Sequence, residues 1–233
     1  MRTTRFSGLD WATELKNITM VGLGGIGSWT ALNLSRIGHT LYMIDPDIVD
    51  ETNVTGGQMY RLSDVLQYKT DAVINICKEM GAINEMYAIH EYFSEEMGIS
   101  DICICGLDNM KARKVVFDTW KKHVLSKKEE ERKNCILIDG RMNSENFDVF
   151  CILGSSDAQI EEYEKKWLFT DEEVGEMDCT MKQTTFMGMG ISSFITASLC
   201  NWLTNRKLDI DFREVPFYQR FYAPAFNYLN ESI

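Results

Sequence analysis

Short apolar stretches alternate with longer amphipathic stretches along most of this chain. The short ones are rich in Ile, Val, Thr and Met, which favours strands, and the longer ones repeat apolar residues at helical spacing. The pattern predicts strands at residues 17–23, 40–45, 86–93, 101–107, 135–140 and 147–153. It predicts helices at 24–38, 61–67, 69–81, 108–126, 157–169 and 184–205, with a single helical turn at 94–98. Weaker alternation in 208–224 predicts further short strands.

This order of elements predicts an α/β fold with a doubly wound, mainly parallel, Rossmann-like sheet, followed by a C-terminal helix and short strands. Alternating strands and helices produce parallel strands joined by right-handed crossovers. Ligands of such sheets bind beyond the carboxyl ends of the strands. Gly22, Asp45 and Asp108 all fall at predicted strand ends, so we expect the functional site there.

Charge and composition exclude several classes of function. The net charge of −11 argues against binding to nucleic acids and to anionic membranes, which both attract basic surfaces. Residues 1–17 lack the apolar core of a signal peptide. The apolar run 188–203 contains Ser and Thr and is shorter than the roughly 20 residues of a membrane span. We therefore expect a cytoplasmic protein with no membrane or nucleic-acid partner.

The seven cysteines are odd in number and lie mostly in apolar runs, which favours buried free thiols over a disulfide framework. No C-x-x-C pair occurs, so we expect no zinc site. The histidines, His39, His90 and His123, are scattered and predict no site.

A glycine-rich turn follows the first predicted strand. Its sequence, GLGGIG, places Gly22, Gly24 and Gly27 at the G-x-G-x-x-G spacing, with Gly25 between them. The first glycine allows a tight turn, the second lets the backbone approach a phosphate, and the third lets the helix pack against the strand. Backbone N–H groups at the helix start would then face an anion. The turn predicts a nucleotide site and serves NAD and ATP equally.

The residues after this turn favour ATP. Asp45 ends the second strand, where an acidic residue binds ribose, and Asp47 would contact the sugar or only orient the loop. An NAD site needs nothing more, yet the chain continues with polar residues that suit a triphosphate: Asn53, Gln58 and Lys69. Asp108 follows a buried strand and is a natural Mg²⁺ ligand. A metal ion and a lysine would stabilise pyrophosphate as it leaves.

These ordered motifs resemble the ThiF/MoeB/HesA family of adenylyltransferases, whose fold ubiquitin-activating enzymes share. The chain has GLGGIG, then DPDIV from Asp45, Asn53–Val54 with Gln58, DVLQYK ending at Lys69, and DNMKAR from Asp108 to Arg113. The resemblance covers about residues 5–145. It implies one domain over 1–233, with a nucleotide-binding core at 1–150 and a C-terminal part at 151–233 for substrate and dimer contacts.

The resemblance also implies a reaction with ATP and Mg²⁺. Family members adenylate the C-terminal carboxylate of a small protein, commonly a ubiquitin-like or sulfur-carrier protein ending in glycine. The implied roles are ribose binding for Asp45, phosphate contacts for Asn53 and Lys69, metal binding for Asp108 and nucleotide binding for its neighbour Asn109. The family further implies a homodimer, in which Arg5 would reach the ATP of the partner subunit or remain a solvated arginine.

Two departures from the family pattern concern the phosphate site. The arginine of N-x-x-R-Q is absent, since Gly56 and Gly57 precede Gln58, and the glycine of D-V-G is Leu66. Arg61 or Arg141 would have to supply the missing charge. Without it, the chain could bind a nucleotide but adenylate slowly or not at all.

Cys179 is the candidate acceptor of a thioester. It precedes the long apolar helix, whose dipole favours a thiolate, and it resembles the C-T pair of some ubiquitin-activating relatives. Its acidic neighbours, Glu176 and Asp178, oppose a thiolate, so a purely structural role stays open.

The leading hypothesis is an ATP-dependent adenylyltransferase that activates the C-terminus of a ubiquitin-like or sulfur-carrier protein. The alternatives are activation of a short peptide or an RNA base, and a catalytically weak partner subunit that binds nucleotide. A nicotinamide-dependent oxidoreductase ranks last, because no residue provides an obvious base for hydride transfer.

Overall fold

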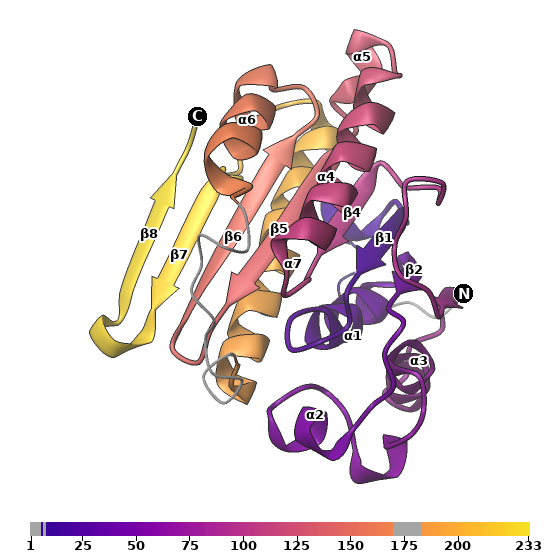
Figure 1. Cartoon of the computed structure of the whole chain (residues 1–233). Coiled ribbons are helices and arrows are strands. Elements are labelled where there is room, and N and C mark those ends of the chain that lie inside the picture. Colours follow the sequence, from indigo (N-terminus) through magenta and orange to yellow (C-terminus); the bar gives the residue numbers. More distant parts are fainter. Residues whose placement is uncertain (1–5, 7, 170–182) are drawn as a thin grey trace.

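The computed structural model describes residues 6, 8–169 and 183–233. It contains an eight-stranded sheet in the order β3-β2-β1-β4-β5-β6-β7-β8 (Figure 1). The strands are β1 (Asn17–Val21), β2 (Thr40–Ile44), β3 (Met86–Ile89), β4 (Ile102–Cys105), β5 (Ile136–Met142), β6 (Asn146–Leu153), β7 (Tyr218–Tyr222) and β8 (Asn227–Glu231). The helices are α1 (Gly27–Ile37), α2 (Glu51–Thr55), α3 (Lys69–Glu79), α4 (Met110–Leu125), α5 (Glu129–Arg132), α6 (Asp157–Glu162) and α7 (Thr185–Leu208).

The first five strands of the chain form a parallel sheet, which confirms the predicted Rossmann-like α/β fold. The chain moves outward from β1 to β2 and β3, then crosses back so that β4 pairs with the other side of β1 and β5 with β4. The later strands β6, β7 and β8 extend the sheet in antiparallel fashion. The carboxyl ends of β1, β2 and β4 consequently lie together.

Side-chain alternation along the strands divides the core into two layers. In β4, Ile102 and Ile104 face one apolar cluster, which contains residues of α1, α3 and α7, whereas Cys103 and Cys105 face a second cluster with residues of α4 and α6. All four are buried. The helices therefore cover both faces of the sheet (Figure 1), as period-2 burial on both sides requires.

Two segments differ from the predicted elements. Residues 61–67 form only a 3-10 turn, Leu62–Asp64, because Leu66 has a φ of 73° and donates its N–H to the Val49 carbonyl at 2.9 Å. The connection between β3 and β4, residues 90–101, contains a turn in which Met97 N–H bonds to Ser94 O, but no helix. On the face of the sheet that carries α4, residues 90–101 therefore cover β1 and β2 without a helix.

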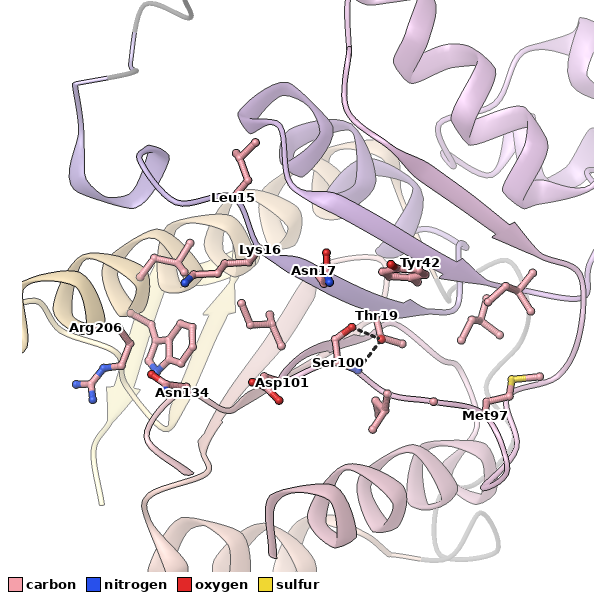
Figure 2. A pocket seen from close by; sticks show the side chains of 17 residues that line it. Leu15, Lys16, Asn17, Thr19, Tyr42, Met97, Ser100, Asp101, Asn134 and Arg206 are labelled. Atoms are coloured by element: carbon pink, nitrogen blue, oxygen red, sulfur yellow. Dashed lines mark hydrogen bonds between the residues drawn. The ribbon is translucent and has the colours of Figure 1, made fainter. Parts of the chain in front are cut away.

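A cavity of about 850 Å³ occupies this region, over β1 and β2. Tyr42 and Thr19 of the sheet line it, as do Met97 and Ser100 of the connection (Figure 2). It extends to the amino ends of the strands, where Asp101 contributes to its wall. No residue of the glycine turn lines the cavity, which also reaches Ile44 and Ile89 at the carboxyl ends of β2 and β3.

Helix α7 belongs to the core. Among the described residues it is the one helix long and apolar enough to cross a membrane, yet half of its most apolar window is buried inside the protein. Ile191 and Ile195 contact the place where a side chain at Gly140 of β5 would lie. The helix thus packs on the sheet.

Candidate functional site

The glycine turn joins the end of β1 to α1 with no room for larger residues at two of its positions. Gly22 has a φ of +87°, which L side chains rarely adopt. A Cβ on Gly27 would overlap the carbonyl oxygen of Gly22. At Gly24, in contrast, the nearest atom to an added Cβ is Gln58 Nε2, 4.0 Å away. The backbone of Gly24 is therefore open to a ligand in front of the N-terminus of α1.

Asp45 stabilises the glycine turn through hydrogen bonds to the backbone. Its carboxylate accepts hydrogen bonds from Leu23 N–H at 2.6 Å and from Asp47 N–H at 2.9 Å, and its side chain is buried. Burial raises the pKa of Asp45, while Lys69 and the two backbone N–H groups oppose the rise. Tyr60 adds a bond from its hydroxyl to the Leu23 carbonyl at 2.6 Å. Asp45 therefore supports the glycine turn, and each of its carboxylate oxygens keeps a further acceptor position.

Lys69 and Asp47 form an ion pair at the edge of the site. Lys69 begins α3, is buried, and places its Nζ 2.7 Å from Asp47 Oδ2, whose side chain is exposed. The Lys69 N–H also bonds to the Asp47 carbonyl at 2.9 Å. The ammonium is therefore held in position by Asp47, and a phosphate would have to share it with that carboxylate.

The two amide side chains predicted to bind nucleotide, Asn53 and Gln58, differ in whether their oxygen already has a hydrogen-bond partner. Asn53 uses its oxygen to accept from Asp50 N–H at 3.1 Å, as part of the capping box of α2. Gln58 lies against Gly24, and its Oε1 is buried without a hydrogen-bond partner among the described residues. A buried polar atom without a partner is costly, so Gln58 retains hydrogen-bonding capacity for a ligand.

Asp108 and Asn109 follow β4, and they also differ. Both are exposed. Asn109 Oδ1 accepts from Ala112 N–H at 2.8 Å and caps α4, so its side-chain oxygen already has a partner in the helix. Asp108 forms no hydrogen bond or ion pair within the described part of the chain. Its free carboxylate fits the oxygen ligand that Mg²⁺ prefers.

These features correspond to a known family. A model of the ThiF family matches residues 7–199. The chain belongs to the ThiF family. The protein named adenylyltransferase and sulfurtransferase uba4, from Aspergillus niger, is 28% identical over 108 residues, which are 44% of this chain and 22% of that protein.

Solved structures of other proteins share the fold. PaaA superimposes with a TM-score of 0.71 at 18% identity, and E. coli MccB, solved with ATP, with a TM-score of 0.67 at 14% identity. Each superposition covers 96% of this chain and 66% of the other. This chain therefore spans about a fifth of the curated relative and less than two thirds of the structural ones. At these identities the structural likeness shows the fold alone.

The arginine of the ThiF-type DNMKAR motif lies in a buried network that the sequence did not reveal. Arg113 is paired with Asp139 of β5, and both side chains are buried. Asp139 also accepts from Arg141 Nε at 2.9 Å and from the Tyr163 hydroxyl at 2.7 Å. Arg141 stacks over the ring of Phe150 at 4.7 Å. Burial lowers the pKa of Arg113 and raises that of Tyr163. The motif arginine therefore connects α4 to the sheet.

Neither candidate for the missing family arginine is free at the glycine turn. Arg141 is engaged by Asp139, as above. Arg61 binds Asp64 at 2.8 Å and also pairs with Glu79 of α3. The ion pairs of both guanidinium groups would have to break before either could reach a phosphate.

The N-terminus of α7 packs against Gly56 and Gly57, the positions at which the family pattern has its arginine. An added Cβ at Gly57 would come within 2.5 Å of the backbone nitrogen of Thr185, and Gly57 has a φ of +93°. Gln183 lies against Gly25 and Gly56 in the same way. Trp29 Nε1 donates to the Gly57 carbonyl at 2.9 Å. The glycine pair thus allows α7 to approach the nucleotide turn, and Gln183 becomes a site-lining residue that no sequence motif indicated.

Arg5 and Cys179 lie outside the described residues. Their predicted roles remain predictions that rest on the resemblance to the family.

Proposed function

We propose that this chain is an ATP-dependent adenylyltransferase that activates the C-terminal carboxylate of a ubiquitin-like or sulfur-carrier protein. The observation that carries the proposal is the open backbone of Gly24, flanked by the unpaired oxygen of Gln58, at the strand ends where Asp108 presents a free carboxylate. Membership of the ThiF family supports it, as do the name of the uba4 relative and the structure of MccB with ATP.

Each residue has a physical role in the proposed reaction. The N–H groups at the start of α1 would bind phosphate oxygens, since a helix N-terminus favours an anion. Asp45 would hold the ribose, and Lys69 would turn from Asp47 to the phosphates. Asp108 would hold Mg²⁺, which neutralises phosphate charge. A substrate carboxylate oxygen would attack the α-phosphorus. The bond between the α-phosphorus and the oxygen that links it to the β-phosphate would break, and pyrophosphate would leave.

The first experiment measures binding of ATP with Mg²⁺ by calorimetry, with NAD as the competing ligand. ATP should bind and NAD should not. Asp108→Ala should weaken binding of the metal–nucleotide complex and leave thermal stability unchanged, because the side chain is exposed and unpaired. Asp118→Ala is the matched control, since Asp118 is a partly exposed aspartate of α4, the helix that follows Asp108, and is paired with Lys114. Tight NAD binding without ATP binding would refute the proposal.

The second experiment measures ATP–pyrophosphate exchange with a ubiquitin-like protein ending in Gly-Gly and with a copy lacking the two glycines. Exchange should require the intact C-terminus, and Asp108→Ala should reduce it by about 100-fold or more, as loss of one electrostatic stabiliser does elsewhere. Exchange with a short peptide and not with the ubiquitin-like protein would show that the substrate is a peptide.

A nucleotide-binding subunit with little catalysis of its own is the second candidate function. The engagement of Arg61 and Arg141 in other ion pairs favours it. It predicts ATP binding without exchange for any of these substrates, so the two experiments together separate the candidates.

Arg5 and Cys179 complete the proposal on the basis of family resemblance. In a homodimer with shared sites, mixing Arg5→Ala with Lys69→Ala subunits should restore part of the exchange activity. If Cys179 accepts the acyl group, Cys179→Ala should keep exchange and lose a thiol-sensitive adduct with the substrate protein. An adduct of equal yield in the mutant would exclude Cys179 as the acceptor.

A further inference from the structure

Three side chains of metal-ligand type meet at the end of the parallel sheet opposite the nucleotide site. Asp101 directly precedes β4, His123 lies in the last turn of α4, and Cys135 directly precedes β5. Their ligand atoms all lie within 4.8 Å of one another. His123 Nε2 is 2.7 Å from Asp101 Oδ1. The sequence places these residues far apart, so neither the spacing of histidines nor that of cysteines revealed the cluster.

Rigid elements hold the cluster together. Strands β4 and β5 are paired in parallel with Ile102 opposite Ile136, so the preceding residues, Asp101 and Cys135, start neighbouring strands side by side. The Ile136 N–H bonds to the Asp101 carbonyl at 2.9 Å. Helix α4 is the crossover between these strands, and it brings His123 back to the same end. Ligands held by regular elements need little reordering when an ion binds.

We propose that Asp101, His123 and Cys135 form a Zn²⁺ site with three protein ligands. Thiolate sulfur, imidazole nitrogen and carboxylate oxygen are the three ligand types that zinc uses in proteins. Zinc–ligand bonds of about 2.0–2.3 Å place neighbouring ligands of a tetrahedral site roughly 3.5 Å apart, so side-chain rotations suffice to enclose an ion. The charges of the carboxylate and the thiolate balance those of the ion.

Lys127 and the Cys135 proton must both respond to the ion. Lys127 Nζ lies 2.9 Å from Asp101 Oδ1, and this long side chain is partly exposed, so it can turn toward solvent. Burial of Cys135, together with the charge of Asp101, raises the pKa of its thiol to about 12. Without metal, the thiol is therefore protonated, and the ion replaces that proton.

The cluster borders the cavity over β1 and β2. Asp101 and Asn134 both line that cavity, and Figure 2 shows Asp101 at its wall. The fourth zinc position, filled by water or by an atom of a molecule in the cavity, lies on this side. A bound ion would join the start of β4, the end of α4 and the start of β5, the unit whose other end carries Asp108. The proposal does not depend on the adenylation chemistry.

The test uses full-length, tag-free protein stripped of metal. Co²⁺, which replaces zinc in such sites, should bind one ion per chain and produce a thiolate-to-cobalt charge-transfer band. Zn²⁺ affinity is then measured by competition with a coloured chelator. Cys135→Ala should abolish the band. Cys135→Ala and His123→Gln should each lower zinc affinity by more than about tenfold, because even the outer partners of metal ligands contribute that much.

The controls are Cys200→Ser and His90→Gln, which change a cysteine and a histidine outside the cluster and should leave band and affinity unchanged. His123 is partly exposed, so its variant should fold even where Cys135→Ala does not. Circular dichroism checks both. Unchanged zinc affinity in folded His123→Gln, or no zinc binding by the wild type beyond that of the variants, would show an ordinary hydrogen-bonded cluster and overturn the proposal.

Discussion

The polar groups at the two ends of the parallel sheet differ in how many of them have hydrogen-bonding partners. At the carboxyl end, Gly24, Gln58 and Asp108 keep hydrogen-bonding or ligand capacity that no described residue uses. At the amino end, Asp101 accepts from both His123 and Lys127, and His39 is buried against the backbone of Lys16. The difference teaches that Gln58 and Asp108 at the carboxyl end remain available for a ligand, whereas Asp101 at the amino end is already paired with neighbouring side chains beside the cavity.

The first test asks whether the carboxyl end also contains a closed polar network, formed by Asp139, Arg113 and Arg141. Asp139→Asn leaves the buried Arg113 and the partly buried Arg141 without their carboxylate, and such a loss costs about 3–5 kcal/mol. Chemical denaturation measures the change. Asp148→Asn is the matched control on β6, because its partner Arg220 is exposed and such pairs contribute about 1 kcal/mol or less. Equal losses for the two variants would contradict a structural role of the buried network.

The second test concerns His39 at the amino end of the sheet. His39 is fully buried, its Nδ1 accepts from Lys16 N–H at 3.2 Å, and burial, aided by the charge of Lys16, lowers its pKa to about 4. The unfolded imidazole binds a proton below about pH 6.5 and the folded one only near pH 4, so acid favours unfolding. His39 should contribute stability above pH 6.5, and a loss of about 3 kcal/mol should develop as the pH falls to 4.

His39→Asn isolates this contribution, because its amide oxygen can replace Nδ1 as the acceptor and does not titrate. The free energy of unfolding is measured against pH for both proteins. The wild type should lose more stability between pH 6.5 and 4 than the variant. Parallel curves would show that His39 is not the group responsible.

The third and smallest effect separates two glycines of the same turn. Gly27→Ala places a methyl group against the Gly22 carbonyl and should cost about 1–3 kcal/mol, as overpacking does. Gly24→Ala meets no atom closer than 4.0 Å, so it should fold normally and bind ATP more weakly, since the methyl group fills the space that we propose for a phosphate. Thermal melts with and without ATP and Mg²⁺ make the comparison. A destabilised Gly24→Ala with unchanged nucleotide affinity would reverse the assignment.

Most elements were predictable because their patterns are long and local. The apolar run of β4 and the glycine turn into α1 are examples in which neighbouring residues decide the structure. Residues 61–67 were predicted wrongly because other contacts decide there: Asp64 accepts hydrogen bonds from Arg61, and Leu66 and Gln67 pair with Val49 in the loop after β2. Helical propensity is a weak preference that such contacts override.

The candidate site was predictable to the level of strand ends and no further. The positions of Gly22, Asp45 and Asp108 follow from where strands stop. The sequence does not predict that Asn53 and Asn109 serve in helix caps, because caps and ligands compete for the same amide groups. Gln183 and the cluster of Asp101, His123 and Cys135 depend on contacts between elements distant in sequence. Such convergence is a property of the folded chain alone.

The packing of α7 against α1 has a consequence for how the protein is made. The Asn33–Ser192 hydrogen bond joins residues 159 positions apart, and Gly188 sits against the Gly25 carbonyl and Trp29. A ribosome completes α1 early and α7 late, so the glycine turn waits for its final neighbours until most of the chain has emerged. Contacts this distant in sequence slow folding and leave apolar surface exposed meanwhile. The surface of α1 that α7 covers therefore stays exposed until residues 185–208 have been synthesised.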